Sequence, residues 1–98
     1  MEGLTYKGYR IEPTLNASRE LIKHRYSIYD IIEILENGYE CSASRRKENI
    51  EEKCLRKGNK EVKVVVALTT VLYPDKFTET VWRLIHFGII TYKKGRRK

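Results

Sequence analysis

The sequence is short of the residues that build metal sites, disulfide frameworks and redox motifs. Its 98 residues include two cysteines, two histidines, two prolines and one tryptophan. Cys41 and Cys54 are too few and too far apart for a zinc finger or a redox Cys-x-x-Cys motif. We therefore expect two reduced thiols in a reducing compartment, no metal site and no cofactor.

Long apolar runs are also missing. No run approaches the ~20 residues that a membrane-spanning helix needs, and the N-terminus lacks the basic and apolar regions of a signal peptide. These absences predict no membrane contact and a cytoplasmic location. The sequence also has no phosphate-binding glycine loop, hydrolase elbow, zinc motif or paired-carboxylate site. That excludes many enzyme classes without selecting one.

Positive charge is plentiful, and it is concentrated at one end. The formal net charge is +7, of which five charges come from the last six residues, 93–98, and two remain for the rest. A basic tail attracts phosphates through its field and through counterion release, or it only keeps a terminus soluble. We divide the chain into one domain, residues 1–92, and a basic C-terminal tail, residues 93–98.

Two long strands form the centre of the expected fold, at residues 62–72 and 80–92. Both segments are rich in β-branched and aromatic residues, which suit a pleated, buried surface. The segment between them carries turn residues, Pro74 and Asp75. Apolar residues occur on both faces of the first strand, which favours a sheet covered on both sides, for instance by a partner subunit.

Two adjacent helices are expected near residues 16–25 and 27–37. Asn16 is the predicted N-cap of the first helix. Ser27 and Asp30 have the spacing of a capping box ahead of an apolar stripe in the second helix. Asn37-Gly38 should end that helix, because glycine readily adopts the left-handed conformation common after helix C-termini.

Shorter strands complete the pattern. They are expected at residues 6–12 and 50–56, with an irregular one near 39–45, and Gly58 and Asn59 should form a hairpin turn. The expected fold class is α+β, with two adjacent N-terminal helices packed on one antiparallel sheet in the order β-α-α-β-β-β, plus an optional fourth late strand.

The segment from Asn16 to Ser27, followed by Asn37-Gly38, resembles a small uncharacterised domain family. Its pattern is roughly His-Ala-x-x-Arg-Met-x-x-Arg-Gly-Ile-Ser ahead of a helix that ends in Asn-Gly or Asn-Pro. The family is similar to RelE- and BrnT-like toxins of toxin–antitoxin systems. The resemblance implies a β-α-α-β-β-β layout, RNA as a partner, an antitoxin-like protein or a homodimer as another, and metal-independent ribonuclease activity.

The chain departs from that family at three positions of the motif. Asn16 replaces the leading histidine, Glu20 the first arginine and His24 the second. Asparagine cannot serve as a general base, because its amide does not titrate in the useful range. The sequence leaves open whether ribonuclease activity is retained, weak or lost.

The candidate catalytic residues are Arg83 and His86, since the resemblance implies catalysis by charge stabilisation and positioning. The two residues are three apart on one strand and therefore point to opposite faces, unless a bulge, which Gly88 permits, re-aims one of them. We expect at most one to act. We favour Arg83, because His86 shares its expected face with Trp82 and therefore should be buried.

Further basic side chains are candidates for binding nucleic acid, or they serve only to keep strand edges from aggregating. They are Arg45, Arg46, Lys47, Lys53, Lys93, Lys94, Arg96 and Arg97. Trp82 could stack on a base or belong to the core. The competing interpretation of the whole chain is a non-enzymatic module that binds a partner protein or a second copy of itself.

Overall fold

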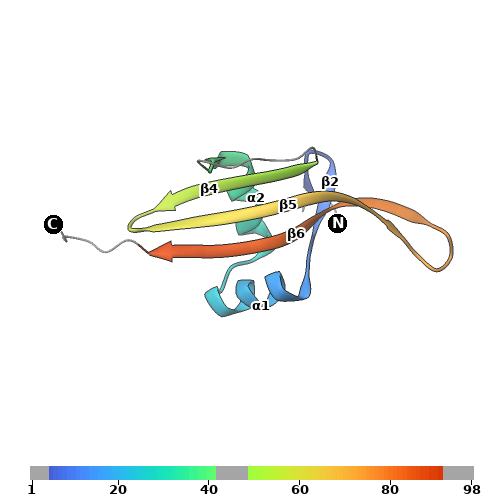
Figure 1. Cartoon of the computed structure of the whole chain (residues 1–98), viewed down its shortest axis with the longest axis horizontal. Coiled ribbons are helices and arrows are strands. Elements are labelled where there is room, and N and C mark those ends of the chain that lie inside the picture. The colour runs from blue at the N-terminus through green and yellow to red at the C-terminus, as the bar shows by residue number, and fades with distance from the viewer. Residues whose placement is uncertain (1–4, 42–48, 92–98) are drawn as a thin grey trace.

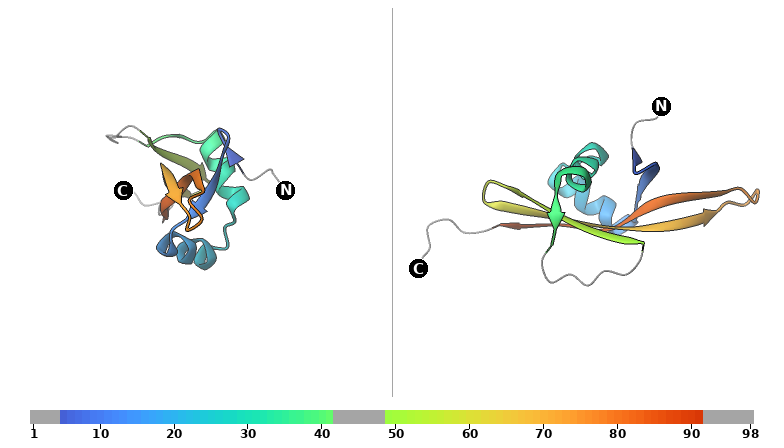
Figure 2. Two further views of the ribbon diagram at one scale, coloured as in Figure 1. Left: turned by 90° about the vertical axis from the view of Figure 1, so that its right-hand side faces the viewer. Right: turned by 90° about the horizontal axis from the view of Figure 1, so that it is seen from above.

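The computed structural model describes residues 5–41 and 49–91. Two helices, α1 (Leu15–His24) and α2 (Ile28–Asn37), pack on one face of a six-stranded sheet (Figure 1, Figure 2). The strands lie in the order β1-β2-β6-β5-β4-β3. The predicted α+β class and the predicted order of elements are confirmed.

The strands differ greatly in length. The short ones are β1 (Thr5–Tyr6), β2 (Tyr9–Pro13) and β3 (Tyr39–Glu40), and the longer ones are β4 (Ile50–Lys57), β5 (Lys60–Leu72) and β6 (Thr78–Thr91). The β5–β6 hairpin extends well beyond the helices (Figure 1), and we call its projecting part, residues 69–80, the hairpin arm. The two long central strands and the Gly58-Asn59 turn are confirmed.

The sheet is antiparallel except at one junction. β2 runs parallel to β6 over three register pairs, from Ile11 opposite Trp82 to Pro13 opposite Leu84. A sheet antiparallel throughout was expected, so this pair is a difference from the prediction. The predicted first strand is also split by a turn at Lys7 and Gly8, both with positive φ, so that β1 and β2 form a small hairpin.

The N-cap predicted for α2 is confirmed, whereas the N-cap predicted for α1 is not. The Asp30 carboxylate accepts a hydrogen bond from the Ser27 backbone N–H at 2.8 Å, as the predicted capping box requires. The N-cap of α1 is Thr14, whose hydroxyl accepts from the Ala17 N–H at 3.2 Å. Asn16 lies inside the first turn, so its predicted capping role is wrong.

Gly38 ends α2 as predicted, but for a different reason. Its φ of −77° is an ordinary extended value rather than a left-handed one. A Cβ at this position would lie 2.5 Å from the Ile34 carbonyl oxygen and 2.6 Å from that of Cys54. Glycine is needed because the helix end and β4 approach each other closely.

One continuous core lies between the helices and the sheet. The deepest side chains come from α2 and from the facing sides of β5 and β6: Ile31, Ile34, Leu35, Val62, Val64, Val66 and Leu84. Trp82 belongs to this core, since it is 5% exposed and its indole N–H donates to the Tyr6 carbonyl oxygen at 2.9 Å. Its position excludes stacking on a bound base.

Cys41 and Cys54 are joined by a disulfide, with Cα atoms 5.5 Å apart. The expectation of two reduced thiols is therefore wrong. The sequence alone could not reveal the bond, because the short β3–β4 pairing that brings the two residues together depends on Tyr39 lying opposite Cys54. Among the described residues, no helix is long and apolar enough to cross a membrane.

Candidate functional site

A β-bulge in β6 decides where the predicted catalytic residues point. Val66 pairs with Leu84 and Val65 with His86, which leaves Ile85 as an extra residue. Side chains alternate along a strand, and one inserted residue reverses the alternation beyond it. Leu84 and Phe87 therefore both point toward the helices, and His86 points away from them.

His86 is exposed, so its predicted burial beside Trp82 is wrong. The bulge at Ile85 also places His86 on the same face of the sheet as Arg83, rather than on the opposite one. The sequence indicated a bulge only through Gly88, three residues further on. Gly88 has another role here: the His86 ring leans over it, with Nε2 3.1 Å from where a glycine Cβ would be.

His86 lines an open groove between α1 and the outer edge of β6. The volume of this groove is about 750 Å³. Its lining comes from two segments only: Asn16, Ala17, Arg19, Glu20, Lys23 and His24 on α1, and residues 85–89 on β6. His86 lines the groove from the β6 side although it points away from the helices, and α1 supplies most of the polar groups.

The α1 side of the groove contains all three positions at which the chain departs from the family pattern. Asn16, Glu20 and His24 are four residues apart, which places them along one side of a helix. The Glu20 carboxylate lies 3.5 Å from His24 Nε2, and the His24 ring packs 6.0 Å from the Phe87 ring. The substituted residues therefore lie together on the α1 side of the groove that His86 lines from β6.

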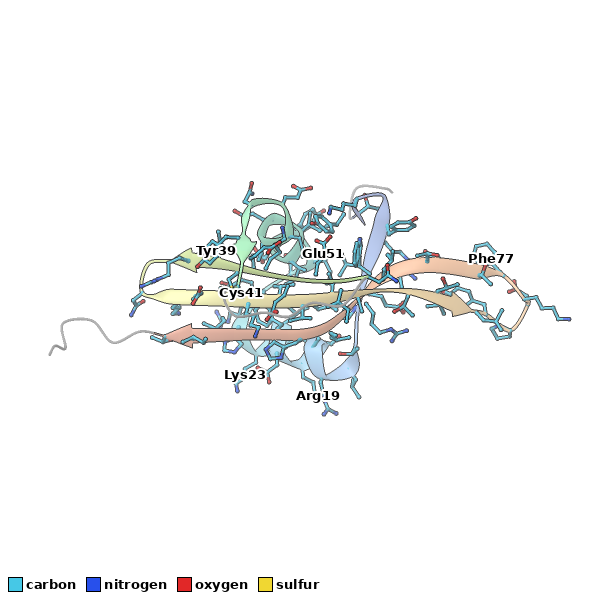
Figure 3. All side chains as sticks on the ribbon, turned by 45° about the horizontal axis from the view of Figure 1, so that its top comes forward. Arg19, Lys23, Tyr39, Cys41, Glu51 and Phe77 are labelled. Atoms are coloured by element: carbon cyan, nitrogen blue, oxygen red, sulfur yellow. A yellow bond between two sulfur atoms is a disulfide. The ribbon has the colours of Figure 1, made fainter. Side chains whose placement is uncertain are left out.

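Arg19 and Lys23 also line this groove and add positive charge to it, and their side chains project from α1 away from the strands (Figure 3). Both are exposed and lie one helical turn apart on α1. Neither residue was among the site residues predicted from the sequence. Only the spacing of Asn16, Glu20 and His24 could have indicated this face, because nothing in the sequence shows that α1 lies against β6.

The other predicted residues do not meet in this groove. Arg83 lies opposite Glu12 of β2 and Ala67 of β5, outside the groove lining. Lys53 lines a separate, smaller pocket of about 230 Å³ beside Lys7. The remaining predicted residues lie outside the described ranges: Arg45, Arg46, Lys47, Lys93, Lys94, Arg96 and Arg97.

In residues 5–41 and 49–91, no group of three or more His, Cys, Asp or Glu side chains is arranged to hold a metal ion. What the groove offers instead is two imidazoles, a guanidinium, an ammonium, a carboxylate and an amide. Searches against protein-family models, curated proteins and solved structures find no match to this chain.

Proposed function

We propose that the protein binds single-stranded RNA in the groove between α1 and β6, and that it is a weak, metal-independent ribonuclease related to RelE-like toxins. The observation that carries the proposal is that His24 of α1 and His86 of β6 both line this groove. They are the two histidines of the chain and are 62 positions apart. The neighbouring Arg19 and Lys23 provide charge suited to a phosphate.

The proposed chemistry is attack of the RNA 2′-oxygen on the adjacent phosphorus. A general base removes the 2′-hydroxyl proton, the bond to the 5′-oxygen breaks, and a general acid protonates that oxygen, which leaves a 2′,3′-cyclic phosphate. Imidazole can serve in either role near neutral pH. We assign the acid to His24, because a Glu20 carboxylate oxygen lies 3.5 Å from its Nε2 and can orient the ring, and the base to His86.

Positive groups complete the proposed mechanism. Negative charge grows on the phosphoryl oxygens in the transition state, and fixed cations nearby stabilise it. Arg19 can bind two of these oxygens in fork geometry, whereas Lys23 acts as a point charge. Asn16 cannot move a proton, but its amide can donate a hydrogen bond to phosphate or base. Loss of the family histidine at this position is consistent with a slow enzyme.

The test is cleavage of a single-stranded RNA in EDTA by the wild type and by His86→Ala, His24→Ala and Arg83→Ala. Removing a general acid or base should slow cleavage by about 10²–10⁴-fold, and products should carry cyclic phosphate ends. Arg83→Ala is the matched control, since Arg83 lies on β6 outside the groove. Equal rates in wild type and both histidine variants would contradict the catalytic assignment.

Binding can be tested apart from cleavage. Titration of RNA at two salt concentrations should give a steep salt dependence that Arg19→Gln and Lys23→Gln together make shallower, because fewer counterions are released. Removal of residues 93–98 tests the tail in the same way. An unchanged salt slope after the groove substitutions would place RNA elsewhere.

We propose a cytoplasmic location, where RNA is available, and an antitoxin-like protein as the natural partner. The disulfide bears on this proposal, since cytosolic thiols are usually kept reduced. Alkylation of cell lysates under acid quench reports the state of Cys41 and Cys54 directly. A fully oxidised pair in cells would indicate either an oxidising compartment or a protected bond.

A second candidate function, a non-enzymatic interaction module, is favoured by the hairpin arm. Its tip exposes Leu72 at 71% and Phe77 at 59% (Figure 3), and the Phe77 ring stacks on the Tyr73 ring, with 5.9 Å between the ring centroids. Residues 69–80 carry Asp75, Lys76 and Glu79, a net charge of −1. An uncharged or slightly acidic arm with apolar ends suits a protein surface rather than a phosphate backbone.

A polar cluster joins the outer part of the arm to Arg10 of β2. Arg10 donates to both carboxylate oxygens of Glu79, at 2.8 and 3.1 Å, and the Tyr73 hydroxyl donates to the same carboxylate at 3.0 Å. These hydrogen bonds keep the pKa of Glu79 below its usual range.

If the arm joins two copies of the chain, Leu72→Ser with Phe77→Ser should convert a dimer to a monomer, as measured by light scattering. A monomeric wild type would exclude a homodimer.

A further inference from the structure

The outer edge of β6 is open over half of its length. β2 covers this edge only at residues 82–84. The Thr14 N–H then donates to the Leu84 carbonyl oxygen at 3.0 Å, and the chain turns into α1. From Ile85 to Thr91, no strand within the described ranges pairs with this edge, and α1 is the element that lies beside this part of β6 (Figure 1).

The register identifies which backbone groups face that space. Lys57 and Lys60 flank a two-residue turn and are therefore a hydrogen-bonded pair. The direction of backbone hydrogen bonding alternates along β5. The backbone N–H and C=O groups that face β6 are therefore those of Glu61, Lys63 and Val65. Their partners in β6 are Ile90, Gly88 and His86. The intervening residues direct their N–H and C=O groups outward: Phe87, Ile89 and Thr91.

Helix α1 covers the space beside the outer edge of β6. The helix packs against β6 and lies toward the outer side of the strand (Figure 1). The groove of about 750 Å³ separates the exposed side of α1 from residues 85–89. Paired strands lie ~4.8 Å apart, so a strand bonded to this edge would lie in the groove, beneath α1.

The charges around the groove select among possible strands. Arg19 and Lys23 are exposed on α1, while the carboxylate of Glu20 is directed to His24 at 3.5 Å. An acidic strand would therefore meet two cations. A second copy of this chain carries a net charge of +7, and it would bring the same Arg19 and Lys23 against their equivalents.

We propose that the β6 edge accepts an extended acidic segment of a partner protein as an additional strand. Its backbone pairs with the outward groups of Phe87, Ile89 and Thr91, and its acidic side chains on the α1 side contact Arg19 and Lys23. Strand addition of this kind takes affinity from main-chain hydrogen bonds and specificity from alternate side chains. The proposal does not depend on RNA cleavage.

The probe is a synthetic peptide of about eight residues, alternating valine and glutamate, which at ~3.4 Å per residue spans the open edge. Two further peptides carry N-methyl groups on all valines or on all glutamates. Only one edge of an added strand bonds to β6, so one N-methylated peptide should bind at least about tenfold more weakly and the other nearly normally. Fluorescence anisotropy measures all three.

Two protein variants complete the test. Arg19→Glu with Lys23→Glu should weaken binding of the acidic peptide by about tenfold or more, whereas Lys76→Glu, at the tip of the hairpin arm, should leave binding unchanged.

If both kinds of N-methylation weaken peptide binding equally, or if neither does, strand pairing is overturned. If oligouridine binds and the peptide does not, the groove is a nucleic-acid site and not a peptide site. A dimer that Ile89→Pro dissociates would assign the edge to a second copy, and either result overturns the proposal.

Discussion

Gly38 shows how a single residue is constrained by a contact that its own dihedral angles do not reveal. Glycine-to-alanine changes at ordinary φ values usually stabilise a protein, because they restrict the unfolded chain. Here the added Cβ would lie within 2.6 Å of two carbonyl oxygens, those of Ile34 and Cys54. The backbone of α2 and β4 would have to move apart.

We expect Gly38→Ala to lower the free energy of unfolding by about 1–3 kcal/mol, as overpacking does. Urea denaturation followed by circular dichroism measures it. Glu36→Ala, an exposed change in the same helix, is the control. A gain in stability for Gly38→Ala would mean that α2 and β4 do not approach closely in solution.

Tyr6, Lys7 and Glu51 form a second residue-scale feature, a polar cluster at the end of the core. The Tyr6 hydroxyl donates to Glu51 at 2.7 Å, and Lys7 contacts the same carboxylate at 2.9 Å. Burial, followed by the bond to Glu51, raises the pKa of Tyr6 to about 12. Burial acts to raise the pKa of Glu51 as well, but the hydrogen bonds from Lys7 and Tyr6 outweigh it and lower that pKa.

The raised pKa of Tyr6 predicts alkaline destabilisation. An unfolded tyrosine ionises near pH ~10, so the contribution of Tyr6 is fully present below that pH and is lost as the pH rises toward about 12. Tyr6→Phe removes the ionisable group and should flatten the loss of stability above pH ~10. Tyr29→Phe, at an exposed position, should not. Identical alkaline profiles for wild type and Tyr6→Phe would contradict the assignment.

At the scale of elements, the sequence predicted what depends on local pattern. The apolar stripe of α2, the two-residue turn at Gly58 and the long β5 and β6 strands all follow from periodicity and turn residues. It did not predict the parallel β2–β6 pair or the bulge at Ile85, because both depend on distant partners. The groove was missed for the same reason, since α1 and β6 meet only in the folded chain.

The disulfide is the element-scale feature with the largest expected effect on stability. It joins two residues 13 positions apart and ties Cys41, just after β3, to β4. Closing a loop of this size stabilises by about 3 kcal/mol, mainly by restricting the unfolded chain. Cys41→Ala with Cys54→Ala should lose about that much in urea denaturation.

Reductant provides the matched control for this double variant. Dithiothreitol should destabilise the wild type by about the same amount and leave the variant unchanged, since the variant has no bond to break. If reductant leaves the unfolding midpoint of the wild type unchanged, the disulfide is not formed in solution.

For the whole molecule, the order of the strands has a consequence for biosynthesis. β6 lies between β2 and β5 in the sheet, yet it follows both in the chain. Leu21 of α1 packs in the same core as Phe87 of β6. Leu21 is therefore synthesised well before its packing partner, and it stays unpacked during this wait. At 5–20 residues per second, that wait is about 3–13 s.

A nascent chain in that interval exposes the apolar side of α1 and the unpaired edges of β2 and β5. Chains ending at residue 79 should therefore be degraded rapidly in pulse proteolysis, whereas chains ending at residue 92 should resist as the full protein does. Synthesis of β6 thus converts a protease substrate into a folded protein in a single step, and chaperones that bind apolar helices would have their target only until then.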